Sequence, residues 1–183
     1  HDPAAPQFAR MSRVASKHLE VVNRWCAPGK LLDAGCSTGL FLDQARAAGH
    51  DVEGVEYSTA SAAFARRHFG LTVTDGDIHA VTAPPESFDI ITMFDVIEHV
   101  PDPSRDMAAI HRLLKPGGQF IVSTPNIDGI FPRWSLKLAK ALDYWPHPEP
   151  PHHLYQFSVK TLSAMLDKCG FDVEDAHHIN IDL

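Results

Sequence analysis

The sequence of 183 residues lacks several features that mark specialised classes of protein. No apolar run approaches the roughly 20 residues of a bilayer-spanning helix, and no signal peptide is visible at the start. The 16 Lys and Arg are outnumbered by 23 Asp and Glu, and the formal net charge of −7 argues against nucleic-acid binding, which needs clustered cations. The three cysteines are odd in number and far apart, which argues against a disulfide framework or a zinc cage. We therefore expect a cytoplasmic protein with reduced thiols.

The chain does contain an alternation of short strands and longer helices. Apolar residues between Phe8 and Trp25 recur at steps of three and four, which predicts an amphipathic helix over 7–25. The predicted strands that follow are 30–34, 51–56, 71–75, 88–94, 119–124 and 171–176. The predicted helices between them are 39–48, 59–69, 103–114 and 159–168, the last two capped by Asp102 and Ser158. This alternation indicates an α/β fold with a mainly parallel sheet and helices on both faces.

Residues 126–153 interrupt the alternation and contain Trp134, Trp145 and five prolines. We interpret 126–157 as a lid-like insertion that covers the substrate in a single domain spanning 1–183. The other parts are an N-terminal helix within 1–29, a core at 30–125 and a C-terminal helix and strand within 158–183. In the insertion, Arg133, Lys137 and Lys140 share one helical face. This pattern fits either contact with a membrane surface or a plain lid, and three cations favour the lid.

The stretch LLDAGCSTG at 31–39 joins the first predicted strand of the core to a helix. Open parallel sheets bind ligands outside the carboxyl ends of their strands. Gly35 and Gly39 allow the backbone to approach a ligand closely, and a helix beginning near Thr38 directs N–H groups toward the same place. The dinucleotide pattern G-x-G-x-x-G and the P-loop pattern are both absent.

Further side chains suited to a nucleoside follow the next two strands. Glu56 ends the second strand, where a carboxylate can accept hydrogen bonds from ribose hydroxyls. Tyr57 offers a flat face for an adenine ring, although it could simply pack. Asp77 follows the third strand, where it can accept from an exocyclic amine.

Five segments in this order resemble the class I S-adenosylmethionine-dependent methyltransferases: LLDAGCSTG, GVEYS, GDI, FDIITMFDVIEHVPDP and LLKPGGQFIVSTPN. The resemblance covers about residues 30–173, and DVIEHV and STPN are similar to segments of the ubiquinone-biosynthesis O-methyltransferase group and its bacterial relatives. It implies a doubly wound, Rossmann-like sheet of seven strands. Because only HHINIDL follows FDVEDA, we expect the last strand to be incomplete.

The same resemblance implies that the chain binds S-adenosyl-L-methionine and releases S-adenosyl-L-homocysteine. The expected cofactor-binding residues are Asp33, Gly35, Cys36, Ser37, Gly39, Glu56, Tyr57, Asp77, Ile78 and Phe94. Cys36 is expected to be chosen for its small size, Ile78 to belong to the core or the adenine floor, and Phe94 to act through its backbone or van der Waals contact. Ser37 departs from the family, in which a glycine is frequent at this position.

Methyl transfer to a hydroxyl requires alignment of the reactants and a group that takes the proton. His99, just after the fourth strand, is the first candidate base, since imidazole titrates near neutral pH. A purely structural role at a helix start is the alternative. In the pair His152-His153, at the end of the insertion, His153 is the second candidate.

Asp95, Glu98 and His99 form a D-x-x-E-H cluster. The RNA 3′-terminal 2′-O-methyltransferases hold a divalent metal with a similar E-x-x-E-H cluster, so a Mg²⁺ or Mn²⁺ site is one interpretation. The other, which we favour, is that the two acids cap and charge a helix start. We predict an O-methyltransferase for a small-molecule hydroxyl. The alternatives are an N- or C-methyltransferase of the same fold and a non-catalytic binding module; the acceptor and the oligomeric state are left open.

Overall fold

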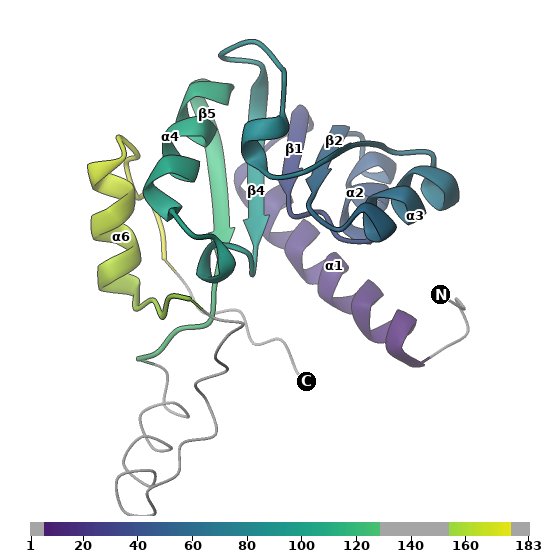
Figure 1. The fold of residues 1–183 in the computed structure, drawn as a ribbon, viewed down its shortest axis with the longest axis horizontal. Coiled ribbons are helices and arrows are strands. Elements are labelled where there is room, and N and C mark those ends of the chain that lie inside the picture. Colours follow the sequence, from purple (N-terminus) through teal and green to yellow (C-terminus); the bar gives the residue numbers. More distant parts are fainter. Residues whose placement is uncertain (1–5, 129–153, 177–183) are drawn as a thin grey trace, which may run out of the picture.

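The computed structural model describes residues 6–128 and 154–176, which form a parallel sheet with helices on both faces (Figure 1). The five strands of the sheet have the order β3-β2-β1-β4-β5. Their bounds are β1 (Lys30–Ala34), β2 (Asp51–Glu56), β3 (Thr72–Asp75), β4 (Phe88–Phe94) and β5 (Leu114–Ser123). The helices are α1 (Pro6–Trp25), α2 (Leu40–Ala47), α3 (Thr59–Phe69), α4 (Pro103–Leu113) and α6 (Val159–Lys168), with 3₁₀ turns η1 (Ile78–Ala80) and η2 (Ile97–His99).

The central strands bury side chains on both faces because helices cover both. In β1, Leu31 belongs to the apolar cluster shared with α1, α2 and α3, whereas Leu32 belongs to the cluster shared with α4 and α6. In β4, Ile90 and Ile91 divide between the clusters in the same way. Figure 1 shows the two groups of helices on opposite sides of the sheet. The nearly continuous apolar sequence of these strands follows from this double coverage.

The predicted helix starts after the fourth and fifth strands are confirmed in atomic detail. The Asp102 carboxylate accepts from the N–H of Arg105, and Pro103 occupies the first turn of α4. Ser158 and Thr161 form a reciprocal capping box at the start of α6. No described helix is both long and apolar enough to cross a membrane.

Within the described residues one expectation is not confirmed and two require correction. The sheet there has five strands, all paired in parallel, so the expected count of seven is not confirmed. Residues 171–176 form no strand, since their backbone pairs with no neighbouring strand; Phe171 instead packs its ring 5.3 Å from that of Phe120. The strand predicted at 119–124 is longer at its start. Residues 115–118, which follow the predicted helix 103–114, lie inside β5, where the register shifts between the pairs Phe88–Leu114 and Ile90–Gln119.

The order of the strands identifies one point where the chain reverses direction across the sheet. From β1 the chain passes outward through β2 and β3, then returns to place β4 on the other side of β1. Open α/β sheets bind ligands at such a switch point, outside the carboxyl ends of the strands. The site is therefore sought at the loops that follow β1 and β4.

Candidate functional site

The loop after β1 is a tight turn that leads into α2. Gly35 (φ +87°), Ser37 (φ +49°) and Gly39 (φ +82°) all have left-handed backbone conformations. Gly39 is the N-cap of α2, which begins at Leu40 rather than near Thr38, and no side chain caps this helix. The helix start thus directs backbone N–H groups toward the carboxyl edge without a protein side chain to accept from them.

The two glycines are also required by contacts within the protein. A Cβ on Gly35 would collide with the side chain of Val96, and one on Gly39 would lie 2.6 Å from Cδ1 of Leu71. The turn needs glycine for backbone geometry and packing, so the two residues do not by themselves establish a ligand. The backbone of Ser37 is left-handed, a conformation that a non-glycine residue adopts with strain. This strain is a physical reason for glycine to be frequent at the position in the family.

Glu56 connects the end of β2 to the loop after β1. Its Oε2 accepts from the N–H of Ser37 at 2.8 Å, and its Oε1 accepts from the N–H of Ser58 at 2.7 Å. The carboxylate is held in one orientation by these two bonds and retains further lone pairs. It is therefore a fixed acceptor beside the glycine turn, as a diol-binding group must be.

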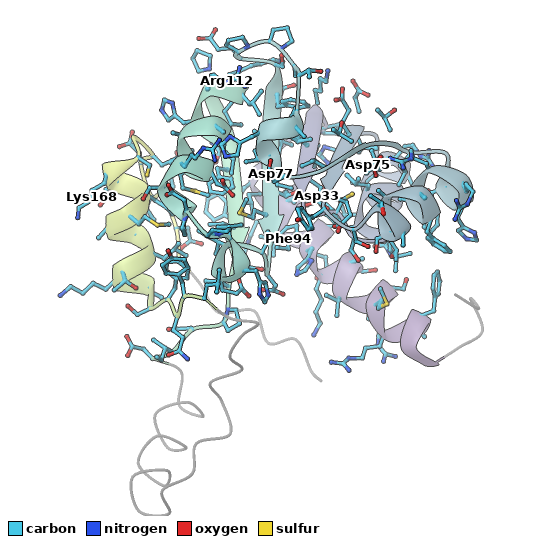
Figure 2. The ribbon with its side chains drawn as sticks, in the orientation of Figure 1. Asp33, Asp75, Asp77, Phe94, Arg112 and Lys168 are labelled. Atoms are coloured by element: carbon cyan, nitrogen blue, oxygen red, sulfur yellow. The ribbon has the colours of Figure 1, made fainter. Side chains whose placement is uncertain are left out.

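Asp33, near the end of β1, is only 4% exposed. Its Oδ1 accepts from the hydroxyl of Thr92 on β4 at 2.7 Å. Figure 2 labels Asp33 on β1 and Phe94 at the end of β4. Burial raises the pKa of the Asp33 carboxyl to about 7; the Thr92 hydrogen bond opposes the shift, and the charge of Glu56 adds to it. Asp33 is thus a buried carboxyl group, linked to β4, just before the turn.

Cys36 is buried against β2 and fits the expectation that its small size matters. A Cβ on Gly54 would lie 2.6 Å from the Cys36 Sγ, so the thiol fills the space above that glycine. Burial raises the pKa of the thiol above its ordinary value, with Asp33 and Glu56 adding to the shift. Its environment is that of a packed, unreactive cysteine.

The residues expected around an adenine ring differ in exposure. Tyr57 is 83% exposed, and Asp77 is also exposed, with its Oδ1 accepting from the N–H of His79 at the start of η1. Ile78 is buried among the core residues that face α4, which favours the core role over the adenine floor. Asp77 and Tyr57 remain accessible beyond β3 and β2.

Phe94 ends β4 and packs through its ring on the side of the sheet covered by α1. The ring of His18 stacks on it with centroids 3.9 Å apart and an interplanar angle of 10°, and Phe41 meets it edge-on at 5.2 Å. His18 was not among the residues predicted for the site. A signal was present, since His18 lies three residues after Ala15 and four before Val22, on the buried stripe of the first helix.

Asp95, Glu98 and His99 do not converge on a common point. The Asp95 Oδ1 accepts from the hydroxyl of Ser123, and the Glu98 Oε2 accepts from that of Thr124. Glu98 is 2% exposed, burial raises the pKa of its carboxyl, and its Oε1 lies 3.9 Å from the Nε2 of His99. Among residues 6–128 and 154–176 no three His, Cys, Asp or Glu side chains are placed to hold a metal ion. Neither acid caps a helix as expected, because the N-cap of η2 is Val96, but Glu98 does place an acid in the first turn of η2.

The two ends of the insertion, near Asn126 and at 154–157, contact each other and the core. Asn126 pairs with Phe157 in an isolated bridge, and the N–H groups of Leu154 and Tyr155 donate to the carbonyl of Glu98. The two flanks of the segment are thus fixed next to η2 and His99. His153, His152, Trp134, Trp145 and the cations Arg133, Lys137 and Lys140 lie outside the described residues.

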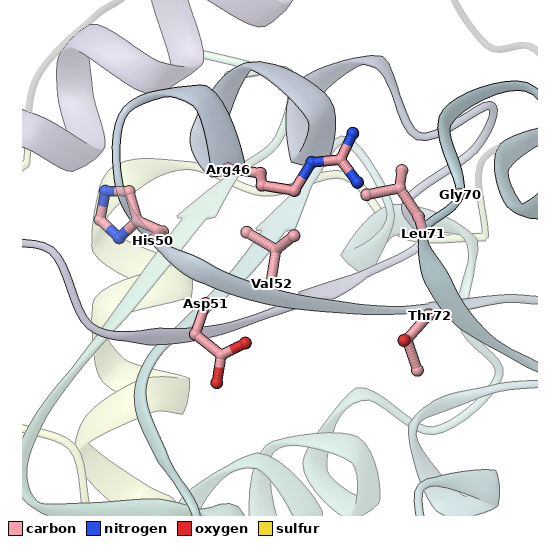
Figure 3. Close-up of a pocket in the computed structure, with 7 residues that line it drawn as sticks. All are labelled: Arg46, His50, Asp51, Val52, Gly70, Leu71 and Thr72. Atoms are coloured by element: carbon pink, nitrogen blue, oxygen red, sulfur yellow. The ribbon is translucent and has the colours of Figure 1, made fainter.

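A separate hollow lies at the opposite edge of the sheet. Figure 3 shows its lining, which is Arg46, His50, Asp51, Val52, Gly70, Leu71 and Thr72. These residues include the first residues of β2 and β3, so the hollow is at the amino edge. Parallel sheets of this kind do not bind their ligands there. The carboxyl edge remains the candidate site.

Comparison with known sequences identifies a family that matches this chain. A family model described as a methyltransferase domain matches residues 8–176. A protein of Mycolicibacterium smegmatis described as a probable S-adenosylmethionine-dependent methyltransferase is 31% identical over 151 residues, which are 82% of this chain and 54% of that protein. The ubiquinone biosynthesis O-methyltransferase of an Azoarcus species is 34% identical over 134 residues, 68% of this chain and 57% of that protein. The chain spans about half the length of the curated relatives it matches.

Solved structures share the fold over most of the chain. A Thermotoga maritima S-adenosylmethionine-dependent methyltransferase, titled a possible histamine N-methyltransferase, aligns with a TM-score of 0.70 and 26% identity, covering 91% of this chain and 74% of that one. An Archaeoglobus fulgidus methyltransferase aligns with a TM-score of 0.69 and 21% identity, covering 89% and 69%. The second likeness concerns the fold alone.

Proposed function

The chain belongs to the methyltransferase-domain family, and on this premise we propose that it binds S-adenosyl-L-methionine at the carboxyl edge and transfers its methyl group to a small-molecule acceptor. The observation that carries the proposal is the junction of Glu56 with the glycine turn. The carboxylate at the end of β2 is fixed 2.8 Å from the N–H of Ser37, and so presents acceptors beside the turn. A ribose diol matches this acceptor, and the accessible Asp77 beyond β3 matches the exocyclic amine of adenine.

The transferred group is best placed at the switch point between β1 and β4. S-adenosylmethionine supplies a methyl carbon bonded to a positively charged sulfur, which makes that carbon electrophilic. The chain has to hold the acceptor in line with that carbon, and such alignment contributes roughly 7–11 kcal/mol to related reactions. The loop after β4 and the flanks of the insertion, which meet at Glu98, are the parts of the described structure suited to this task.

The finer proposal is O-methylation of a hydroxyl with His99 as the base. In this reaction the acceptor oxygen bonds to the methyl carbon while the carbon–sulfur bond breaks, and the hydroxyl proton passes to His99. His99 is exposed on η2, directly after the switch-point strand. Similarity to ubiquinone biosynthesis O-methyltransferases, 38% identical over 103 residues in Pseudomonas aeruginosa strain UCBPP-PA14, supports a hydroxyl acceptor.

N-methylation is the second candidate. It is favoured by the likeness to the Thermotoga maritima structure, whose title names a possible histamine N-methyltransferase. A neutral amine is already nucleophilic and needs no strong base. The two candidates therefore differ in how much they depend on His99.

The test has a binding step and a turnover step. Calorimetry should show binding of S-adenosylmethionine, and absence of heat at millimolar ligand would refute the proposal and favour a non-catalytic module. Phenol, quinol, sugar and amine acceptors are then screened for formation of S-adenosylhomocysteine. With a hydroxyl acceptor, His99→Ala should lower kcat by about 10²–10⁴-fold, whereas with an amine it should change little. His68→Ala, an exposed histidine on α3, is the matched control and should leave turnover unchanged.

A further inference from the structure

Two buried histidines of the structure differ in how their ring nitrogens are satisfied. His50 is 3% exposed; its Nδ1 accepts from the N–H of Gly29, and its Nε2 lies 3.1 Å from Oδ1 of Asn23. His18 is 6% exposed, and its buried Nε2 has no hydrogen-bond partner among the described residues. Buried polar atoms almost always have a partner, so each exception requires an explanation.

The position of His18 supplies that explanation. Its ring is stacked on Phe94, the last residue of β4, and lies 6.4 Å from the ring of Phe41 near the start of α2. Phe41 follows the glycine turn, and β4 is the neighbour of β1 at the switch point. The ring that bears the unpartnered nitrogen is thus at the carboxyl edge beside the candidate site, whereas the satisfied His50 lines the hollow at the amino edge.

The order of the strands indicates which part of the cofactor comes near His18. Glu56 after β2 and Asp77 after β3 suit the ribose and the adenine. In the order β3-β2-β1-β4, the rest of the molecule then extends toward β1 and β4. Adjacent strands are about 4.8 Å apart, so β4 lies roughly 10 Å from β2. The part of S-adenosylmethionine that extends away from its nucleoside is an amino acid with an ammonium and a carboxylate group.

We propose that Nε2 of His18 forms a hydrogen bond with the amino-acid end of the bound cofactor, an inference that rests on the proposed function. Burial lowers the pKa of the His18 ring, with the charge of Asp95 opposing the shift, so the neutral ring is favoured. A neutral imidazole offers either an N–H or a lone pair at Nε2, depending on its tautomer. The carboxylate of the cofactor can accept from an Nε2–H, and its ammonium can donate to an Nε2 lone pair. Binding thus supplies the partner that the described residues do not provide.

The test compares two ligands that share the nucleoside and the sulfur and differ in the amino-acid end. S-adenosylhomocysteine has the amino-acid end, whereas 5′-methylthioadenosine keeps the nucleoside and the sulfur but lacks it. His18→Phe retains a ring that can stack on Phe94 and removes both nitrogens. By calorimetry it should bind S-adenosylhomocysteine about tenfold more weakly and 5′-methylthioadenosine unchanged, since one hydrogen bond to a charged group is lost only with the first.

Thermal unfolding without ligand separates this role from a structural one. Tm of His18→Phe should stay unchanged or rise by about 2–4 °C, because an unsatisfied buried atom is removed. His50→Phe is the matched control: Tm should fall, since partners are left unsatisfied, while affinity for S-adenosylhomocysteine should stay the same. A purely structural His18 would lower Tm and leave the ratio of the two affinities unchanged.

Two results overturn the inference. One is a His18→Phe variant that binds S-adenosylhomocysteine as tightly as the parent, and the other is an equal loss for both ligands. If His18→Phe does not fold, His18→Gln and His18→Met are compared. Only the Met variant should bind S-adenosylhomocysteine about tenfold more weakly, because the Gln amide can reach the position of Nε2. A parent protein that binds neither ligand refutes the proposed function itself, which is a different outcome from an unaffected variant.

Discussion

Replacement of Asp33 by Asn should make the protein more stable, and by an amount that grows with pH. Asp33 is almost fully buried, and burial raises the pKa of its carboxyl from 3.8 to about 7. Between these two values the unfolded chain has lost the proton that the folded chain keeps. Stability conferred by protonated Asp33 is therefore lost as pH rises from about 4 to 7. This difference in pKa corresponds to about 4 kcal/mol of stability once the folded carboxyl is ionised.

Urea unfolding of both proteins at pH 5 and pH 8, without cofactor, measures this effect. The gain in free energy of unfolding from Asp33→Asn should be larger at pH 8 by about 2.5 kcal/mol, from the same linkage relation. The amide oxygen of the substituted side chain can still accept from the hydroxyl of Thr92, so the hydrogen bond across β1 and β4 is retained. Asp172→Asn, at an exposed position, is the control and should track the parent at both pH values. A gain that is equal at both pH values would refute the reasoning.

Substitutions at three further positions test the turn after β1 and the carboxylate bound to it. Gly39→Ala should lower the free energy of unfolding by about 2–4 kcal/mol in urea unfolding, because φ is +82° and the new Cβ would lie 2.6 Å from Leu71. Ser37→Gly should raise it by up to about 1 kcal/mol and Ser37→Val should lower it, because φ is +49°; the reverse order would contradict the strain argument. Glu56→Gln should weaken binding of S-adenosylmethionine about tenfold in calorimetry, as a charged acceptor is lost, and unchanged affinity would remove Glu56 from the site.

The elements of the sheet were predictable because their signals are local. Short apolar strands bounded by Gly and Pro, and helices begun by Asp102 and Ser158, are specified within about ten residues of chain. The error at 171–176 has a different cause. An alternating sequence favours an extended backbone, but a strand also needs a partner. Among the described residues β5 pairs with β4 alone, and 171–176 add no strand on its other side. Strand number is thus a tertiary property that the pattern of one segment cannot supply.

The site was predictable as a place but not as a set of contacts. Residues at the ends of successive strands could be expected to lie at one edge, which correctly brought Glu56 near the glycine turn. That its carboxylate accepts from the N–H of Ser37, or that Asp33 accepts from a hydroxyl 59 residues later, depends on register and side-chain orientation. His18 and Phe94 are stacked although 76 positions separate them, and only a histidine on an apolar helical face signalled it.

Unfavourable features accumulate at the carboxyl edge of the sheet, and this asymmetry is itself an argument for where the function lies. Asp33 is a buried acid with a raised pKa, and His18 has a buried nitrogen without a partner among the described residues. At the amino edge, Asp89 accepts from Lys115 and from the N–H of Lys30, and hydrogen bonds lower the pKa of its carboxyl. Evolution retains destabilising groups where activity needs them.

This contrast predicts opposite signs for equivalent substitutions at the two edges. Asp33→Asn and His18→Phe should maintain or raise the free energy of unfolding, whereas Asp89→Asn and His50→Phe should lower it. Affinity for S-adenosylhomocysteine should fall for His18→Phe and remain at the parent value for Asp89→Asn and His50→Phe. Urea unfolding and calorimetry on the same four proteins measure both quantities. If the amino-edge variants weakened binding of S-adenosylhomocysteine as much as His18→Phe does, the loss would reflect general destabilisation, and the division of the sheet into a binding edge and a structural edge would be wrong.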